Sequence, residues 1–180
     1  MSIQPLSSGL AEFLAPYLPI HDLLDTSETI VTLTYAQSLD SIISKGHGVR
    51  TTISHPETKT MTDYLRYHDD GILVGTGTVL ADDPGLNCKF GGTDCYEHSP
   101  RPIIIDCSQK WKFEGSKMQQ LYLLGEGKSP IVVVANEPLL REKHVEYLIC
   151  SPNEAGKLDW FQLFRTLRIR FGLRSIMVEG

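Results

Sequence analysis

Residues 70–84 carry the residue types best suited to holding a nucleotide. An apolar run ends there in Gly75-Thr-Gly-Thr78, and a short apolar turn follows. Glycines let the backbone approach a ligand closely, and the amides that open the next turn suit a phosphate group, to which the Thr78 hydroxyl would add a donor. The spacing is not Gly-x-Gly-x-x-Gly. A tight strand-to-turn connection therefore explains the stretch equally well, with Asp82 and Asp83 as turn formers ahead of a proline.

Two other polar segments follow apolar runs. Thr34-Tyr-Ala36-Gln-Ser38-Leu-Asp40 follows the first run, and Glu179-Gly180 follows the last. In open α/β sheets, ligands bind beyond the carboxyl ends of the strands, so these segments would converge with the glycine-rich turn. The alternatives are that Ser38 and Asp40 only cap a loop, and that Glu179 lies in a frayed terminus.

Metal and nucleophile motifs are not supported. His55-Pro-Glu57 matches half of a zinc deaminase signature, but the Pro-Cys-x-x-Cys half is missing. Glu57 is better interpreted as the reciprocal partner of Ser54 in a helix capping box. The other histidines are scattered, and the four cysteines form no Cys-x-x-Cys pair, so we expect no metal site.

Six short β-branched runs alternate with longer polar or amphipathic stretches, which predicts an α/β fold with a largely parallel sheet. The runs are Ile30–Ala36, Ile72–Val74, Ile103–Ile105, Ile131–Val134, Tyr147–Ile149 and Ile176–Val178. Helices are predicted after the Ser54 capping box, after Asp159, and from Asn136 to His144. Residues 1–29 are interpreted as an appendage with one short helix packed on the domain formed by residues 30–180.

The composition narrows the function classes. The 180 residues include 17 basic and 22 acidic side chains, for a net charge of -5, which argues against a nucleic-acid or anionic-membrane partner. No apolar run approaches the roughly 18 residues of a membrane span. No basic residue precedes Lys45, so neither a secretory signal nor a mitochondrial presequence is supported, and a cytoplasmic location is expected.

Taken in order, these segments resemble the riboflavin-biosynthesis reductases, most closely the monofunctional fungal members of that family. The matching stretches are Val31-Thr-Leu-Thr-Tyr-Ala-Gln-Ser-Leu-Asp40, Val49-Arg-Thr-Thr-Ile-Ser-His-Pro-Glu-Thr-Lys-Thr-Met61, Asp70–Asn87, Ser99-Pro-Arg-Pro-Ile-Ile-Ile-Asp106 and Ser175-Ile-Met-Val-Glu-Gly180. The ordered set is specific, whereas any one stretch alone is weak.

The resemblance implies a dihydrofolate-reductase-like fold, which is a three-layer α/β domain with a mostly parallel central sheet, and a homodimer. It implies NADPH, or NADH in some members, as the hydride donor. The implied substrate is a pyrimidine ribotide whose ribosylamino side chain is reduced to ribitylamino by hydride delivery to the sugar C1′. That chemistry requires positioning and electrostatics rather than a metal.

Site residues are implied only by matching positions. On the cofactor side they are Ala36 against the nicotinamide, Thr78, Asp82, and Glu179 with Gly180 at the start of a turn around the pyrophosphate. On the substrate side they are Arg66, Leu86, Lys89 and again Glu179. A cation is expected for the 5′-phosphate; bacterial relatives carry Arg at the Lys89 position, so bidentate binding there is not implied. No proton donor is assigned.

Family members continue past the point that corresponds to Gly180, with a second glycine, a helix and a final pair of strands. The resemblance therefore predicts that this chain is truncated, binds NADPH weakly and has little activity. Two rival interpretations are an inactive or regulatory remnant of such a reductase, and a dihydrofolate or pterin reductase on the same fold.

Overall fold

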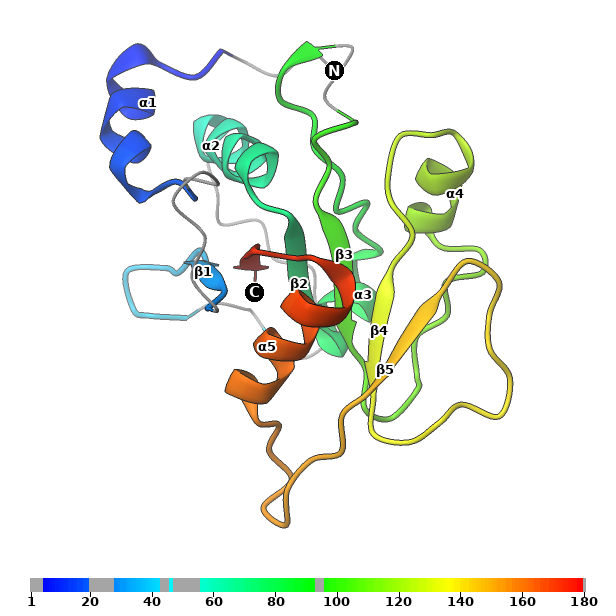
Figure 1. Ribbon diagram of the computed structural model, residues 1–180. Helices are drawn as coiled ribbons and strands as arrows, with labels where there is room; N and C mark the ends of the chain where they lie inside the picture. Colours follow the sequence, from blue (N-terminus) through cyan, green and yellow to red (C-terminus); the bar gives the residue numbers. More distant parts are fainter. Residues whose placement is uncertain (1–4, 20–27, 43–45, 47–55, 93–95, 180) are drawn as a thin grey trace.

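The computed structural model describes residues 5–19, 28–42, 46, 56–92 and 96–179. Within them, six strands form one sheet in the order β1-β6-β2-β3-β4-β5, and every neighbouring pair is parallel (Figure 1). The strands are β1 (Ile30–Thr34), β2 (Gly71–Gly75), β3 (Arg101–Ile105), β4 (Ile131–Val134), β5 (Glu146–Ile149) and β6 (Ser175–Glu179). Each strand coincides with one predicted apolar run, so the predicted α/β class and parallel sheet are confirmed.

Helical segments connect or precede these strands. They are α1 (Ser8–Leu14), the 3-10 turn η1 (Ala15–Tyr17), α2 (Pro56–His68), α3 (Thr76–Asp82), α4 (Lys117–Leu123) and α5 (Trp160–Phe171). α5 begins and ends as the sequence predicts, because Asp159 accepts a hydrogen bond from the Gln162 amide at 3.0 Å and Gly172 ends the helix at φ 71. The predicted Ser54 cap of α2 lies outside the described residues.

The alternation of side chains along the strands builds a core on each face of the sheet. On one face, strand residues such as Ile72, Ile104 and Val132 pack with Phe113 and with Met118 of α4. On the other face, Leu73, Ile103 and Val133 pack with Leu163 and Leu167 of α5, which lies across the sheet in Figure 1. The sheet is therefore the middle of three layers, as the resemblance implies.

One predicted helix is absent. Residues 136–144 form an irregular connection between β4 and β5 instead of a helix. Pro138 removes a backbone donor there, and Leu139 and Leu140 are 102% and 85% exposed, so the apolar side chains have no surface to pack against. The predicted short helix near the N-terminus forms as α1, in which no residue is fully buried and Leu10 and Leu14 are half-buried.

α4 is a helix that the sequence analysis does not anticipate. Its N-cap Ser116 accepts a hydrogen bond from the Gln119 amide at 3.1 Å, and the Gln119 side chain accepts one from the Gly115 amide at 2.8 Å. Ser-x-x-Gln is a helix-start signature, so the signal was present in the sequence.

Because all six strands are parallel, their carboxyl ends lie along one edge of the sheet and their amino ends along the other. We call these the carboxyl edge and the amino edge. β1 is the outermost described strand on its side, and its Val31 and Leu33 side chains are 42% and 66% exposed. The two edges hold different polar groups, and the predicted site residues Ala36, Thr78 and Glu179 follow or end strands at the carboxyl edge.

Candidate active site

Three neighbouring strands bring predicted site residues together at the carboxyl edge. β1, β6 and β2 lie side by side, and Thr34 at the end of β1 pairs with Glu179 at the end of β6. Ala36 follows β1 and is half-buried, while Gly75 ends β2 and is exposed. The strand order, which the sequence does not reveal, therefore places the first, last and second apolar runs next to one another.

The strongest polar contact at this edge is an ion pair between α2 and β6. Arg66 donates from Nη2 to both carboxylate oxygens of Glu179, at 2.9 and 2.8 Å, and from Nε to Oε2 at 3.2 Å. The Arg66 and Glu179 side chains are 14% and 29% exposed. A two-pronged guanidinium–carboxylate contact in partly buried surroundings fixes the orientation of both groups. Two residues that the resemblance implies for the substrate side thus meet directly.

Arg66 also touches two residues outside the predicted site. Its Nη1 donates to the backbone oxygen of Asn87 at 3.4 Å and lies 3.8 Å from Oδ1 of Asp63. Asp63 and Arg66 are three residues apart on α2, so they share one face of the helix. This face of α2 therefore carries a carboxyl group and a guanidinium group, and the guanidinium contacts the segment that follows α3.

Asp63 is an unusual carboxyl group in this cluster. Its side chain is 13% exposed, and burial raises its pKa above the ordinary value of 3.8. The positive charges of Arg66 and Lys89 and the donating backbone amide of Lys89 oppose that rise, while the charge of Glu179 adds to it. Arg66, Lys89, Asp63 and Glu179 thus form one electrostatically coupled group of two cations and two carboxyls.

The segment Leu86–Lys89 presents its predicted substrate contacts in different ways. Leu86 adopts a left-handed backbone with φ 53, and its side chain is only 2% exposed within the core. Asn87 is also buried and donates from Nδ2 to the Glu126 backbone oxygen at 3.0 Å. Lys89 is exposed. Of the two predicted residues, Lys89 can offer its side chain to a ligand, and Leu86 can offer only its backbone.

The glycine-rich turn has room for a ligand. Gly75 is the N-cap of α3, and an added Cβ at Gly75 or Gly77 would meet nothing within 4 Å. Thr76 secures the turn by donating to the Ile105 backbone oxygen at 2.5 Å and to Asp106 at 3.2 Å. These glycines are therefore not required by packing against the described residues, so close approach of a ligand is a reason for them to be glycine.

Thr78 and Asp82 both lie on α3, and both are half-buried. Oδ1 of Asp82 is buried and has no hydrogen-bond partner among the described residues. A buried oxygen of this kind is costly unless another group supplies a donor. Gly180, another predicted cofactor residue, lies outside the described residues.

Ser38 and Asp40 cap a loop, which is the alternative to a ligand-binding role that the sequence left open. The Ser38 hydroxyl donates to Asp40 at 2.5 Å and lies 3.0 Å from the Ile42 backbone oxygen, and it accepts from the Ile42 amide at 3.1 Å. These bonds close a short loop after β1. Their side chains are thus used locally in the structure.

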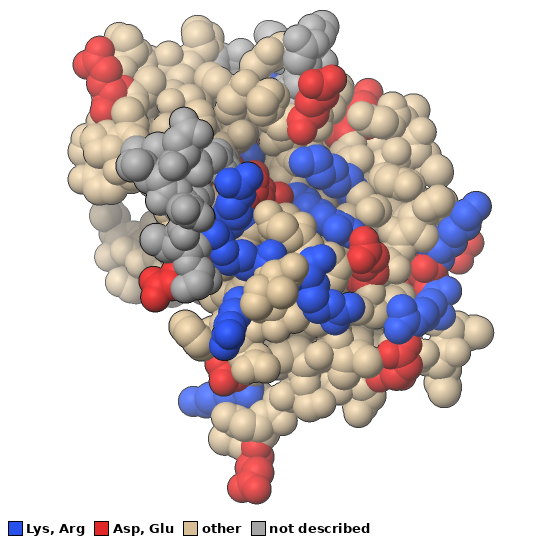
Figure 2. Space-filling model, viewed as in Figure 1, with Lys and Arg blue, Asp and Glu red and all other residues tan. Residues whose placement is uncertain are grey.

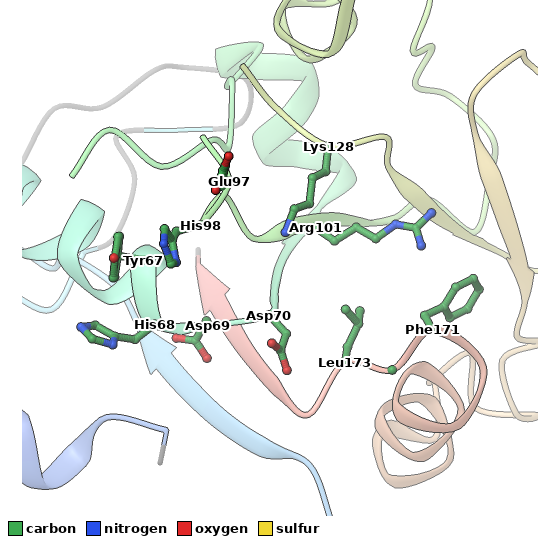
Figure 3. A pocket seen from close by; sticks show the side chains of 11 residues that line it. Tyr67, His68, Asp69, Asp70, Glu97, His98, Arg101, Lys128, Phe171 and Leu173 are labelled. Carbon is green, nitrogen blue, oxygen red and sulfur yellow. The ribbon is translucent and has the colours of Figure 1, made fainter. Parts of the chain in front are cut away.

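A cavity of about 350 Å³ lies at the opposite, amino edge of the sheet (Figure 3). Lys128 enters it from one side, Asp69 and Asp70 face it from the other, and His98 lies against the Tyr67 ring. Asp70 accepts the backbone amides of Arg174 and Ser175 at 2.7 and 3.1 Å, so it anchors the start of β6. This cavity contains none of the predicted site residues.

Basic side chains gather on one face of the molecule. Figure 2 shows Lys and Arg across the middle of the face that α5 covers, with acidic side chains interspersed. α5 itself carries Arg165, Arg168 and Arg170. No group of three or more His, Cys, Asp or Glu suited to a metal occurs in the described parts of the chain, and none of the described helices is long and apolar enough to cross a membrane.

Comparison with known proteins identifies the family. Residues 29–180 match the family described as the RibD C-terminal domain. The chain belongs to this family. The 2,5-diamino-6-ribosylamino-4(3H)-pyrimidinone 5′-phosphate reductase of Saccharomyces cerevisiae is 61% identical over 184 residues, which cover 100% of this chain and 74% of the relative. The Kluyveromyces lactis protein of the same name is 55% identical and is covered to 75%. This chain thus spans about three quarters of each relative's length.

Solved structures of the family confirm the fold. The riboflavin biosynthesis reductase of Saccharomyces cerevisiae superposes with a TM-score of 0.82 at 54% identity, over 96% of this chain and 72% of that one. A bifunctional deaminase/reductase of Thermotoga maritima superposes with a TM-score of 0.66 at 25% identity, over 85% of this chain and 39% of that one. The predicted dihydrofolate-reductase-like fold is thus the fold of the RibD C-terminal domain family.

Two members of the carboxyl-edge cluster were missed in the sequence, namely Asp63 and Asn87. The Asp63-x-x-Arg66 spacing on a predicted helix was an available signal for the first. No local signal marked Asn87, because its backbone oxygen reaches Arg66 only through the tertiary packing of α2 against the segment after α3.

Proposed function

We propose that this protein is the reductase of the riboflavin pathway that converts the ribosylamino side chain of 2,5-diamino-6-ribosylamino-4(3H)-pyrimidinone 5′-phosphate to ribitylamino. The observation that carries the proposal is the Arg66–Glu179 pair at the carboxyl edge, where Arg66 also contacts the backbone of the segment that leads to the exposed Lys89. The high identity to fungal reductases of that name supports the same substrate class.

The residues at the glycine turn fit a nicotinamide dinucleotide, for which we propose NADPH. Gly75 and Gly77 leave open space beside the turn, and the buried Oδ1 of Asp82, which has no partner among the described residues, can accept a hydrogen bond from a ligand. Thr78 would donate its hydroxyl to the cofactor, and Ala36 would leave a flat surface for the nicotinamide ring beside β1. Glu179, and Gly180 after it, would face the pyrophosphate turn. When bound, the cofactor supplies the hydride.

On the substrate side, the proposed roles follow from what each charge already contacts. Glu179 has both oxygens on the Arg66 guanidinium, so we propose that Arg66 orients this carboxylate toward the sugar as well as lining the substrate pocket. The exposed Lys89 ammonium is the proposed contact of the 5′-phosphate. The buried side chain of Leu86 means that its proposed contact is through its backbone. Orientation and electrostatics would supply the catalysis.

The decisive assay is the loss of NADPH absorbance with the diaminopyrimidine ribotide and, separately, with dihydrofolate. The protein should be assayed as the 180-residue chain and with the C-terminal quarter of the Saccharomyces cerevisiae relative appended. We expect the extended protein to oxidise NADPH with the ribotide and not with dihydrofolate. Turnover of dihydrofolate, or no turnover of the ribotide by the extended protein, would contradict the proposal.

We further propose that residues 30–180 form the reductase domain, that residues 1–29 are an appendage, and that the protein acts as a cytoplasmic homodimer. The family match, which begins at residue 29, supports the boundary. The exposed apolar side chains of β1 support a further contact along that side of the sheet. Light scattering of the extended protein tests the dimer, and fluorescent tagging in yeast tests the location.

A further inference from the structure

The backbone pairing between β2 and β3 ends where the glycine-rich turn begins. Gly75, the last residue of β2, pairs with Ile105, the last residue of β3. Beyond this pair, one chain enters α3 and the other enters the connection toward α4. The next residues on the two chains are Thr76 and Asp106. The sheet ladder therefore no longer fixes the chain at Thr76, and other contacts have to hold the start of α3.

Asp106 is a fixed point at the end of β3. The residue is 0% exposed, its backbone amide donates to the Val133 oxygen of β4 at 2.9 Å, and its Oδ2 accepts the Trp111 amide at 2.7 Å. The Thr76 hydroxyl donates to the Ile105 backbone oxygen at 2.5 Å and to Oδ1 of Asp106 at 3.2 Å. The buried carboxyl group thus has one oxygen on each of two chain segments, and it joins the start of α3 to the connection after β3.

Apolar packing contributes little to holding α3 in place. Of its seven residues, all of which the structure describes, Val79 alone is buried. A helix this short depends on tertiary contacts, because its own hydrogen bonds are too few to stabilise it. The same helix carries Thr78 and Asp82, the two residues proposed to contact the cofactor. The link between Thr76 and Asp106 therefore controls where these two side chains lie.

We propose that Asp106 is a positioning residue that anchors the start of α3 through the Thr76 hydroxyl. Through this anchor it sets where Thr78 and Asp82 meet the cofactor. The proposal deepens the proposed function and rests on it. Asp106 acts through its neighbour, because its own side chain is buried. Loss of the link lets α3 shift, so cofactor binding weakens while the ion pair between α2 and β6 on the substrate side keeps its contacts.

Paired substitutions separate this anchor from the general stability of the fold. Thr76→Val keeps the shape of the side chain but removes the hydroxyl, whereas Thr76→Ser keeps the hydroxyl. Asp106→Asn keeps an oxygen for the Trp111 amide and places its NH2 group beside the Thr76 oxygen, which can accept from it. Asp106→Ala removes both contacts. Thr166→Val, the same change at a hydroxyl that donates to a backbone oxygen within α5, is the control.

The first test is a fluorescence titration of the extended protein with NADPH, which requires no turnover. We expect Kd for NADPH to rise about tenfold in Thr76→Val, as for one lost hydrogen bond, and to stay within about twofold of wild type in Thr76→Ser and Thr166→Val. Asp106→Asn should stay within about threefold, and Asp106→Ala should raise Kd about tenfold or more. Adding Thr76→Val to Asp106→Ala should change Kd less than about twofold, because both substitutions break the same link.

The second test is steady-state kinetics of the same variants with the ribotide. KM for NADPH should follow the order of the Kd values, while KM for the ribotide and kcat at saturating NADPH stay within about threefold of wild type. Equal Kd values in Thr76→Val and Thr76→Ser, or a parallel rise of both KM values, would overturn the positioning role, and this comparison holds even if Asp106→Ala does not fold. A wild type that binds NADPH with the expected order of Kd values, but does not turn over the ribotide, would instead contradict the proposed function.

Discussion

Glu179 at the carboxyl edge and Asp69 at the amino edge are carboxyl groups in contrasting surroundings. At the carboxyl edge, Glu179 places both oxygens on Arg66 and keeps 29% of its side chain exposed. At the amino edge, Asp69 is 5% exposed, and the described groups near it that favour its charged form are the neutral hydroxyls of Thr32 and Ser175. The Glu179 carboxylate is thus oriented by a cation and partly accessible, whereas the Asp69 carboxyl group is buried without a cation among the causes that shift its pKa.

The pKa of Asp69 records this difference. Burial is the main cause that raises it from 3.8 to about 7, and the neighbouring Asp70 carboxylate adds to the rise, while the nearby Thr32 and Ser175 hydroxyls oppose it. Asp70 differs from its neighbour because it accepts two backbone amides. Deep burial, with only hydroxyl groups nearby to oppose it, is thus what favours the protonated form of Asp69.

The largest expected effect is on stability at the amino edge. The raised pKa means that the folded protein keeps a proton on Asp69 that the unfolded chain has already lost. Stability is therefore highest below about pH 4 as far as this group is concerned, and it falls as the pH rises from 3.8 to about 7, by up to about 4 kcal/mol in all. Asp69→Asn should remove this slope, so that it is more stable than wild type at pH 8 and similar at pH 4.5.

Urea denaturation at several pH values measures this effect. Asp70→Ala is the matched control, and it should lose stability at every pH because it removes the oxygen that accepts two amides at the start of β6. If wild type and Asp69→Asn have parallel stability profiles between pH 4.5 and 8, then Asp69 is solvated in solution, and the contrast between the edges disappears.

The next effect concerns the pair at the carboxyl edge. Arg66→Met should lower kcat/KM for the ribotide by about a hundredfold, because Glu179 loses its orienting partner and remains partly buried as an unpaired carboxylate. Arg66→Lys keeps the positive charge but lacks the planar guanidinium that donates from two nitrogens, so its kcat/KM should lie between those of Arg66→Met and wild type. The measurement is the initial rate of NADPH oxidation by the extended protein. Full activity in Arg66→Met would show that the pair belongs to the fold alone.

A smaller effect is expected at the unpartnered oxygen of Asp82. If the cofactor supplies its missing donor, Asp82→Ala should raise KM for NADPH about tenfold and leave KM for the ribotide unchanged. The adjacent Asp83 is the control, because its carboxylate accepts the Lys117 amide at 3.1 Å and has that partner already. Asp83→Asn should therefore leave KM for NADPH unchanged. A rise in both KM values in Asp82→Ala would point to a general distortion of α3.

The parts of this fold that sequence could predict are those set by local pattern. Apolar runs predicted all six strands, and Asp159 and Gly172 predicted the limits of α5. The same reasoning failed at residues 136–144, where an apolar pair spaced like a helix remains exposed on a connection. It also failed at α4, whose capping signal was present but whose apolar stripe is short. Pattern alone cannot tell whether a surface exists for an apolar side chain to cover.

Individual site residues could be predicted from the sequence, but the contacts between them could not. Matching positions named Arg66 and Glu179, yet nothing in the sequence shows that residues 113 positions apart form one ion pair. The surroundings of Asp69 were equally hidden, because they include Thr32 of β1 and Ser175 of β6, which are far from Asp69 in the sequence. Both facts follow from strand order, which is a tertiary property.

The smallest expected effect tests whether the amino edge takes any part in the reaction. Burial lowers the pKa of Lys128, and Arg101 lowers it further, while the Asp70 carboxylate opposes them. Lys128→Met removes a cation that is costly to bury and that faces a cavity without any proposed site residue. We therefore expect kcat/KM for the ribotide to stay within about twofold of wild type, with the free energy of unfolding changed by no more than about 1 kcal/mol. Because charge steering acts over about a Debye length, the assay should be repeated at low and high salt. A salt-dependent loss of kcat/KM in Lys128→Met would mean that the Lys128 charge at the amino edge guides the phosphate toward the site. The charges at both edges would then contribute to substrate binding.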